Sequence, residues 1–218
     1  MKRPDGGRDA YARISPYYDV LEFFLKPARE TLTRTVSAWR RRRVLDVCCG
    51  TGTQVLSLRR AGIPAFGVDA SPGMLSRAVR KAGPGLFFAR ADGRCLPCRA
   101  GSFDAVVFSF ALHEKTHAER QALCGEARRV LTPDGLLFVL DYACPAHGKG
   151  AAFMGAVAAI ERMAGAAHFR AFRDYLQRGA TEALLAEQNF GFVSSSLFFR
   201  GTVGLYVAAP ENRRPLSS

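Results

Sequence analysis

The sequence predicts an α/β fold with a doubly wound, mostly parallel sheet, and three observations point to it. Short apolar runs alternate with segments of helical length from residue 44 to residue 141, which is the rhythm of strand–helix–strand units. A glycine-rich turn directly follows the first run, as in ligand-binding sheets of this class. Two further apolar runs, separated by Arg200-Gly201-Thr202, end the pattern and predict an antiparallel hairpin.

The N-terminal segment is predicted to form a helical cover over this sheet. Apolar residues recur at helical spacing over residues 16–39, and Pro27 predicts a break or a fresh start within that helix. The first strand follows at residues 44–48, with the turn CGTGTQ behind it and a helix over residues 54–61. This order is strand, glycine turn and helix.

The remaining core elements follow the same alternation. The second strand covers residues 65–68, and Ser71-Pro72 cap the next helix. The third and fourth strands are expected at residues 86–89 and 103–110, with a helix over 116–131 after them.

A turn at Thr132-Pro133-Asp134-Gly135 is predicted to end that helix, before a fifth strand at residues 136–141. Helical patterns fill residues 150–188, and the hairpin strands are expected at 192–199 and 203–208. We therefore expect a single domain over residues 1–210. Its predicted parts are a cover (1–43), a ligand-binding core (44–142), a helical acceptor-side segment (143–190), a hairpin (191–210) and a loose tail (211–218).

The length, apolar fraction and net charge of the chain limit its expected partners and cellular location. The chain has 218 residues, 48% of them apolar, which is enough for one sizeable core. Its formal net charge of +12 favours anionic partners such as acidic headgroups, nucleic acid or anionic metabolites. No apolar stretch reaches the roughly 20 residues that a membrane span needs, and the N-terminus lacks a secretory apolar region. We expect a cytoplasmic protein, with peripheral membrane contact as an option.

Three aspartates near the glycine turn indicate which ligand it binds. Asp46, Asp69 and Asp92 recur at intervals of 23 residues, and the last two fall where the second and third strands end. A carboxylate at the end of the second strand is where a doubly wound sheet holds a ribose diol. The pattern predicts a bound adenosine. A dinucleotide dehydrogenase fits less well, because its fingerprint needs a third glycine where this chain has Val55.

These residues carry a family resemblance. LDVCCGTG (45–52), GVDASPGML (67–75), ARADGRCLP (89–97) and SFDAVVFSFALHE (102–114) resemble, in order, the motifs of class I S-adenosylmethionine-dependent methyltransferases. That resemblance implies a Rossmann-like, seven-stranded sheet of order 3-2-1-4-5, with an antiparallel hairpin strand inserted at the far edge. Cys48 stands where the family usually has its first glycine.

The ends of the chain indicate a subgroup. YARISPYYDVLEFFLKP (11–27) and LLAEQNFGFVSSSLFFRGTVGLYVA (184–208) resemble segments of the ubiquinone/menaquinone-biosynthesis C-methyltransferases. Phospholipid N-methyltransferases are similar at this level and stay open as an alternative.

The resemblance implies a role for each residue of the cofactor site. The acid of the first strand and the glycine loop would hold the methionine part of S-adenosylmethionine, Asp69 the ribose and Asp92 the adenine amino group. Met74 would pack on the adenine, and residues 109–111 would border the site of transfer. The full expected set is Asp46, Cys48, Gly50, Thr51, Gly52, Gln54, Asp69, Ala70, Met74, Ala91, Asp92, Gly93, Ser109 and Phe110.

The chemistry calls for alignment and, for some acceptors, a base. Methyl transfer is an in-line displacement that needs no metal, so alignment in a dry pocket supplies much of the rate. A carbon or hydroxyl acceptor must also lose a proton. His113, just past the fourth strand, is the candidate general base, and Tyr17 is a second polar candidate. Helices over residues 150–175 could cap an apolar acceptor or serve only as core packing.

Two metal-like patterns are interpreted as coincidental. His113-Glu114-Lys115-Thr116-His117 matches the zinc-protease motif, but it straddles a strand-to-helix loop instead of lying on one helix. Cys95-x-x-Cys98 and Cys144-x-x-His147 follow strands four positions apart, about 19 Å at ~4.8 Å per strand, too far for one ion. No metal is predicted.

Three functions remain for test. The first is an enzyme that methylates a small or lipid-like acceptor. A metalloid acceptor is an alternative within this class, because cysteine thiols near the methyl donor could bind a soft element. The second is a nucleic-acid methyltransferase, which the charge favours but the sequence SFALHE disfavours, because amino-directed enzymes of that kind usually carry an Asn/Asp-Pro-Pro-aromatic loop there. The third is a cofactor-binding protein without turnover.

Overall fold

A computed structural model describes residues 15–82, 87–145 and 150–211, with the side chains of residues 15–24 and 151–152 left out of that description. Within these ranges the strands are β1 (Val44–Val47), β2 (Ala65–Asp69), β3 (Phe88–Arg90), β4 (Phe103–Ser109), β5 (Leu131–Tyr142), β6 (Phe190–Phe198) and β7 (Val203–Pro210). The helices are α1 (Ser15–Ala38), α2 (Thr53–Arg60), α3 (Pro72–Ala82), α4 (His117–Val130), α5 (Ala151–Met163), α6 (Ala166–Gln177) and α7 (Ala180–Glu187), with a short 3₁₀ turn, η3 (Phe199–Gly201).

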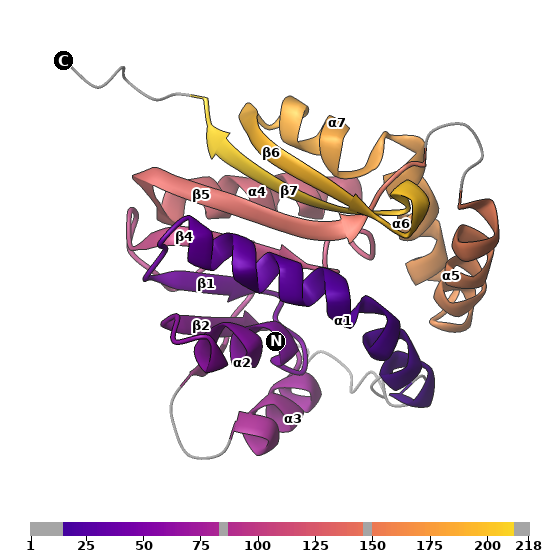
Figure 1. Cartoon of the computed structure of the whole chain (residues 1–218), viewed down its shortest axis with the longest axis horizontal. Helices are drawn as coiled ribbons and strands as arrows, with labels where there is room; N and C mark the ends of the chain where they lie inside the picture. The colour runs from indigo at the N-terminus through magenta and orange to yellow at the C-terminus, as the bar shows by residue number, and fades with distance from the viewer. Residues whose placement is uncertain (1–14, 83–86, 146–149, 212–218) are drawn as a thin grey trace, which may run out of the picture.

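The strands form one seven-stranded sheet in the order β3-β2-β1-β4-β5-β7-β6. The first five strands pair in parallel, while β7 is antiparallel to both β5 and β6. Figure 1 shows α1 crossing one face of this sheet and α4 lying behind it. The predicted fold class, the strand order and the inserted hairpin strand are confirmed.

Burial explains why the central strands read as unbroken apolar runs. All four residues of β1 are buried, and so is the stretch from Leu136 to Tyr142 in β5, because helices cover both faces of a parallel sheet. The outer strand β6 is mostly exposed, with Phe192 and Leu197 open to solvent. The ligand-binding end of the sheet is therefore formed by its most buried strands.

Pro27 does not break the first helix, contrary to one expectation. Helix α1 continues through it, although an interior proline removes one backbone hydrogen bond. Leu25, Ala28, Leu32 and Val36 are all buried at helical spacing on both sides of the proline. This continuous apolar face, packed across the sheet, explains why the helix continues.

Two boundaries also differ from the sequence prediction. The predicted turn at residues 132–135 lies inside β5 as a bulge, because Leu131 pairs with Phe103 while Leu136 pairs with Ala105. The third strand begins at Phe88, later than expected, and residue 86 falls outside the described ranges.

Some predictions concern segments beyond the described ranges. These segments are residues 1–14 of the predicted cover and residues 212–218 of the predicted tail. Among the helices that are described, none combines the length and apolar character needed to cross a membrane.

Candidate functional site

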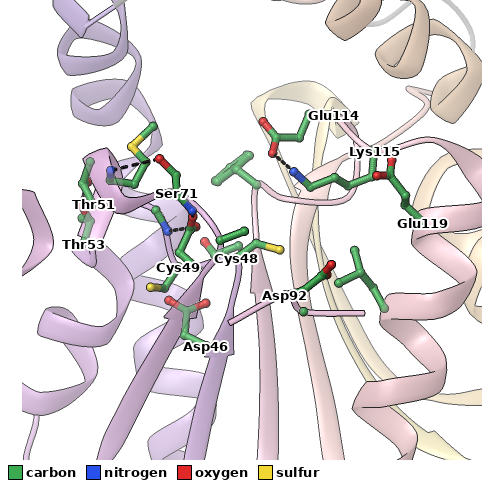
Figure 2. Close-up of a pocket in the computed structure, with 18 of the residues that line it drawn as sticks. Asp46, Cys48, Cys49, Thr51, Thr53, Ser71, Asp92, Glu114, Lys115 and Glu119 are labelled. Carbon is green, nitrogen blue, oxygen red and sulfur yellow. Dashed lines mark hydrogen bonds and ion pairs between the residues drawn. The ribbon is translucent and has the colours of Figure 1, made fainter. Parts of the chain in front are cut away.

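A cavity of about 300 Å³ opens at the carboxyl ends of β1, β2 and β4 (Figure 2). This is the edge at which open α/β sheets bind ligands. It is lined by Arg29, Asp46, Cys48, Cys49, Gly50, Thr51, Thr53, Asp69, Ala70, Ser71, Met74, Asp92, Gly93, Arg94, Ser109, Phe110, Glu114, Lys115, Glu119 and Leu123.

Asp46 lies at the bottom of the cavity without a hydrogen bond. Its side chain is 1% exposed, and neither carboxylate oxygen has a partner among the described residues. Burial raises the pKa of Asp46 to about 8, although the Arg29 charge lowers it and Asp69 raises it further. Because buried polar groups are nearly always paired, these orphaned oxygens mark a place where a ligand supplies the missing partner.

Asp69 shapes the glycine turn that forms one wall. Its Oδ2 accepts a hydrogen bond from the Gly50 backbone N–H at 2.8 Å, and its Oδ1 accepts one from Ser71 N–H at 2.8 Å. Gly50 has a φ of +55°, and a Cβ there would meet no atom within 4 Å. The backbone of the turn thus lies open to the cavity, as close approach to a ligand requires.

The two adjacent cysteines are half-buried, and their thiols are protonated at neutral pH. Burial raises the pKa of Cys48 to about 12, and it raises the pKa of Cys49 further. Since the thiolate is the nucleophile and the ligand for soft elements, these thiols are poorly suited to both tasks. Cys48 also has a φ of 59°, the left-handed region that glycine adopts without strain.

Asp92 lies at the exposed rim. The hydrogen bond from the Arg94 side chain lowers the pKa of Asp92 most, and a second one from the Arg94 backbone N–H lowers it further. The same guanidinium forms an ion pair with Glu119 at 3.1 Å. An ionised, solvent-accessible acid therefore stands at the end of β3, oriented by one arginine.

The opposite wall carries mixed charge. Glu114 and Lys115 form an ion pair across the cavity from Asp46 (Figure 2). From α1, Arg29 donates a hydrogen bond to Ser109 Oγ at 2.7 Å, and its guanidinium lies 5.1 Å from the centre of the Phe110 ring. The helical cover therefore contributes directly to the cavity.

All but three of the predicted cofactor residues line this cavity, the exceptions being Gly52, Gln54 and Ala91. A Cβ on Gly52 would lie 2.5 Å from Phe88 Cζ, so this glycine serves helix–strand packing. Gln54 is buried and its Nε2 donates to Thr33 Oγ1 at 3.0 Å, which ties α2 to α1. Ala91 N–H donates to the Asp69 carbonyl oxygen at 3.1 Å.

Of the two predicted catalytic residues, His113 does not line the cavity. His113 is 3% exposed and lies behind the wall formed by Glu114. The Tyr17 side chain falls outside the described part of α1. A direct base role for either residue stays a prediction.

Sequence reasoning missed several lining residues. Lys115 and Glu114 stand next to His113 in the motif already identified, so their position was a usable signal. Arg94 follows Asp92 by two residues in the same way. Arg29 had no such signal, because nothing in the sequence shows which side of α1 reaches the fourth strand.

The two histidines of the zinc-protease pattern do not share one helix. His113 precedes α4, whereas His117 is the first residue of that helix, and Thr116 caps it with Glu119 in a reciprocal capping box. His117 instead pairs with Glu187 at 3.2 Å. The strands that precede the cysteine pairs, β3 and β5, stand four positions apart in the sheet, and His147 is outside the described residues.

Comparison with known proteins adds independent support. The family description "Methyltransferase domain" matches residues 44–135. A demethylmenaquinone methyltransferase of Thermus thermophilus is 35% identical over 154 residues, which is 63% of this chain and 66% of that protein. A second protein of that name, from Renibacterium salmoninarum, is 35% identical over 152 residues, covering 67% of this chain and 63% of the relative.

The chain carries a methyltransferase domain, residues 44–135, of the class I S-adenosylmethionine-dependent type. It spans slightly less than two thirds of the length of the two curated relatives just described. The predicted resemblance to the methyltransferases is confirmed, and the cofactor of this domain is S-adenosylmethionine.

Solved structures agree on the fold. A Pyrococcus horikoshii protein superposes with a TM-score of 0.62 at 18% identity, covering 88% of this chain and 91% of that one. A possible histamine N-methyltransferase of Thermotoga maritima gives 0.61 at 16% identity, covering 92% and 98%. At these identities the likeness concerns the architecture alone.

The residues present in the cavity fit this cofactor. S-adenosylmethionine carries a sulfonium, an ammonium and a ribose diol. The cavity presents five acidic residues, among them Asp46, Asp69 and Asp92, beside an exposed glycine backbone. The two orphaned oxygens of Asp46 lack the cationic or donor partner that such a ligand brings.

Proposed function

We propose that this methyltransferase transfers the methyl group of S-adenosylmethionine to a carbon of a quinone-like small molecule. The acid-lined cavity beside the glycine turn supports the donor half of this proposal. The relatives named demethylmenaquinone methyltransferases support the acceptor half. An aromatic, reduced quinone also suits a cavity whose lining includes Phe110, Met74 and Leu123.

Within this proposal each acid holds one part of the cofactor. Asp46 and the backbone at Gly50 hold the methionine part, Asp69 binds the ribose diol and Asp92 the adenine amino group. Met74 packs on the adenine ring. All five residues line one cavity, which supports the assignment because a single nucleoside must contact them together.

The reaction itself is a displacement that the protein mainly has to align. When bound, the cofactor supplies an electrophilic methyl group on a positively charged sulfur. Ser109 and Phe110 border the place of transfer, and Arg29 holds Ser109 through its hydrogen bond. The buried strand β4 holds Ser109 and Phe110 in place, and exclusion of water by the bound reactants would favour the in-line geometry.

A carbon acceptor must release a proton. The Glu114–Lys115 ion pair is a polar group that faces the acceptor side of the cavity, and we propose that it orients an acceptor hydroxyl. His113 lies behind it, so any action of His113 on the acceptor runs through Glu114.

Turnover with a defined acceptor tests the proposal. The protein is incubated with methyl-labelled S-adenosylmethionine and a short-chain demethylated naphthoquinol, and the product is analysed by mass spectrometry. We expect one labelled methyl group on a ring carbon. Parallel reactions with a phospholipid amine and with arsenite test the two alternatives left open by the sequence.

Each outcome separates the two halves of the proposal. If the cofactor binds and only the phospholipid or arsenite gains a methyl group, the quinone assignment is wrong. Binding without turnover on any acceptor, in a cell extract as well, would mean a cofactor-binding protein without catalysis.

A further inference from the structure

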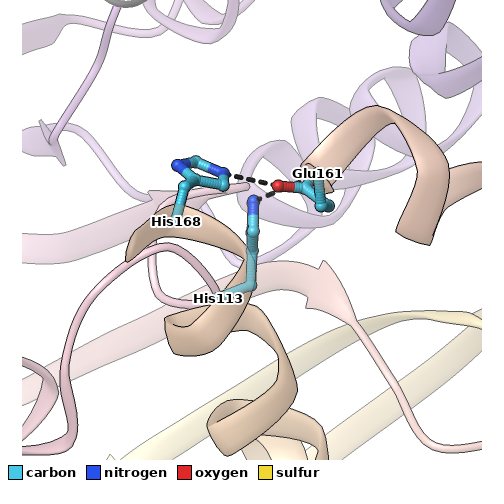
Figure 3. A group of neighbouring side chains, drawn as sticks. All are labelled: His113, Glu161 and His168. Atoms are coloured by element: carbon cyan, nitrogen blue, oxygen red, sulfur yellow. Dashed lines mark ion pairs between the residues drawn. The ribbon is translucent and has the colours of Figure 1, made fainter. Parts of the chain in front are cut away.

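Behind the cavity wall lies a buried cluster that the proposed reaction does not use. His113, Glu161 and His168 come from three separate elements, the loop after β4, α5 and α6, and their side chains converge (Figure 3). One ligand atom from each lies within 4.8 Å of the other two. The side chains of His113, Glu161 and His168 are 4%, 5% and 13% exposed.

The backbone brings the two helical members together. Gly165 separates α5 from α6 with a φ of 126°, a conformation that only glycine adopts readily. As a result, Glu161 Oε2 lies 2.5 Å from His168 Nε2, and Glu161 Oε1 lies 3.6 Å from His113 Nε2. One carboxylate therefore stands between two imidazoles.

Asp141 fixes the orientation of the first imidazole. Its Oδ1 lies 2.7 Å from His113 Nδ1, and its Oδ2 accepts a hydrogen bond from the Leu112 backbone N–H at 2.8 Å. With both carboxylate oxygens accepting, His113 Nδ1 carries the proton in that contact. His113 Nε2 faces Glu161 Oε1 at 3.6 Å. A buried imidazole nitrogen and a carboxylate oxygen that face each other need a cation between them, which is either a proton on the ring or a metal ion.

We propose that His113, Glu161 and His168 bind one divalent transition-metal ion. Two imidazole nitrogens and a carboxylate oxygen suit zinc and its first-row neighbours. Their present separations require only small side-chain rotations to reach metal–ligand distances of about 2.0–2.2 Å. Asp141 supports this proposal, because a metal-bound imidazole usually donates its other ring N–H to a carboxylate, as His113 does to Asp141.

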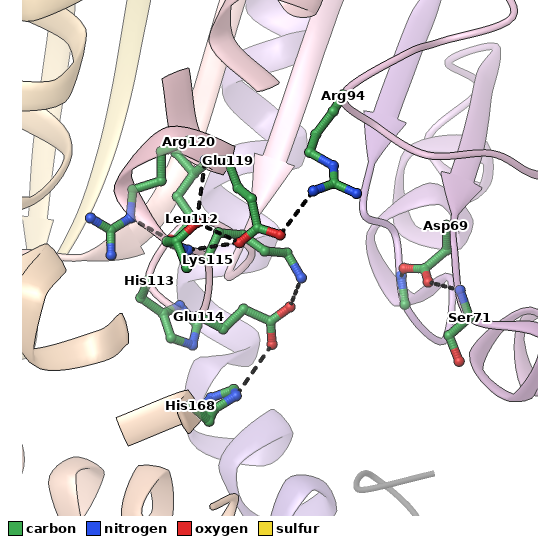
Figure 4. Close-up of polar contacts among 12 residues, drawn as sticks. Asp69, Ser71, Arg94, Leu112, His113, Glu114, Lys115, Glu119, Arg120 and His168 are labelled. Carbon is green, nitrogen blue, oxygen red and sulfur yellow. Dashed lines mark hydrogen bonds and ion pairs between the residues drawn. The ribbon is translucent and has the colours of Figure 1, made fainter. Parts of the chain in front are cut away.

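The site adjoins the cavity without being part of it. None of the three ligands lines the cavity, whereas Glu114 does, and its Oε2 lies 3.9 Å from His168 Nδ1 (Figure 4). A bound ion would hold α5 and α6 against the loop after β4, and so fix the acceptor side of the wall. Three protein ligands leave a position for water or another oxygen ligand.

The test measures metal binding directly. The full chain, produced without a histidine tag and stripped with a chelator, is titrated with Co²⁺ while visible absorption is recorded, and Zn²⁺ content is measured by elemental analysis. We expect one ion per chain, with visible bands of oxygen and nitrogen ligation and no sulfur-to-cobalt charge-transfer absorption. Glu161→Gln and His168→Gln should each weaken binding at least tenfold.

Controls keep the result interpretable. His117→Gln changes a histidine outside the cluster, so it should bind like the original protein. Circular dichroism of each variant verifies folding, and Zn²⁺ should raise the Tm of the original protein but not that of His168→Gln. Three results would each overturn the proposal: no stoichiometric binding, binding by both ligand variants that is as tight as that of the original protein, or sulfur-to-cobalt bands. Cofactor affinity, measured separately, reports on the proposed function alone.

Discussion

Asp46 carries the most unusual environment in the cavity, a buried carboxyl group with no partner among the described residues. Because burial raises its pKa to about 8, the group is protonated in the unliganded protein at neutral pH. A cationic ligand favours the ionised form. Cofactor binding and the ionisation of Asp46 are therefore linked.

The first prediction concerns the pH dependence that follows. Cofactor affinity should rise with pH as Asp46 ionises and level off above about pH 8, whereas Asp46→Asn should lack this component. Calorimetric titration of both proteins from pH 6 to 9 measures it, and their difference cancels the titration of the ligand itself. Parallel pH profiles in the two proteins would contradict the assignment.

Stability should shift in the opposite sense. A carboxyl group whose folded pKa lies above its unfolded value contributes stability that is lost as pH rises from about 4 through about 8. Without ligand, Asp46→Asn should therefore gain stability relative to the original protein over that range. Urea unfolding at pH 5 and pH 8 compares them, and a constant difference would exclude the raised pKa.

Asp69 provides the second prediction. Replacing it with Asn removes the charge that binds a diol but keeps an oxygen that can accept from the turn, so affinity for the demethylated cofactor should fall by about 1.5–3 kcal/mol. Asp104→Asn is a matched control, because Asp104 also accepts hydrogen bonds from backbone N–H groups, of Arg42 and Arg43, away from the cavity. Equal losses in both variants would show a general structural effect.

Cys48 allows a third prediction about backbone strain. At its φ of 59°, Cys48→Gly should be more stable than Cys48→Ala by about 1 kcal/mol, since alanine keeps the strained conformation. At Cys49, which is not in the positive-φ region, the order should reverse because glycine costs more chain entropy. Denaturant unfolding of the four variants decides, and alanine superior at both positions would refute the argument.

Among the helices, Arg120 of α4 connects α6 to the loop that follows β4. The Arg120 side chain is almost fully buried. It donates hydrogen bonds to the Leu112 carbonyl at 3.0 Å and to the Ala171 carbonyl at 2.7 Å, and it forms an ion pair with Asp174 at 2.9 Å. One guanidinium thus joins the loop after β4 to α6 in three directions. This fork geometry is specific to arginine.

The fourth prediction is that Arg120→Met lowers the free energy of unfolding by about 3 kcal/mol, because buried carbonyl partners lose their donor. Arg178→Ala, which removes the other arginine on Asp174, should cost less than about 1 kcal/mol, since both side chains there are partly exposed. Thermal and denaturant unfolding measure both. Comparable losses would mean that Arg120 acts only as a surface pair.

The elements and their order were largely predictable because their signals are local. Buried parallel strands give unbroken apolar runs, and the glycine turn with its acids fixes the ligand-binding edge. The contribution of Arg29, and the convergence of Glu161 with His168, depend on how distant helices pack. Pro27 shows the same limit, because tertiary packing of α1 overrides a local helix breaker.

The whole molecule has more basic than acidic residues, and the proposed cofactor site does not account for this excess. A net charge of +12 attracts anionic surfaces over a Debye length of about 10 Å at moderate salt. The proposed acceptor, a quinone-like molecule, would partition into a membrane if its ring carries an apolar tail. We therefore expect this methyltransferase to bind anionic vesicles at low ionic strength.

Sedimentation with vesicles tests this fifth prediction. Vesicles rich in phosphatidylglycerol should carry the protein down at low salt, and binding should fall steeply toward 0.5 M salt, where screening shortens the range of attraction. Neutral phosphatidylcholine vesicles are the matched control. Salt-insensitive binding to both kinds would instead implicate exposed apolar side chains, of which Phe192 and Leu197 on the outer strand β6 are examples. No binding to either kind would mean that the charge serves another anionic partner, and that the acceptor must reach the cavity without a membrane contact of this protein.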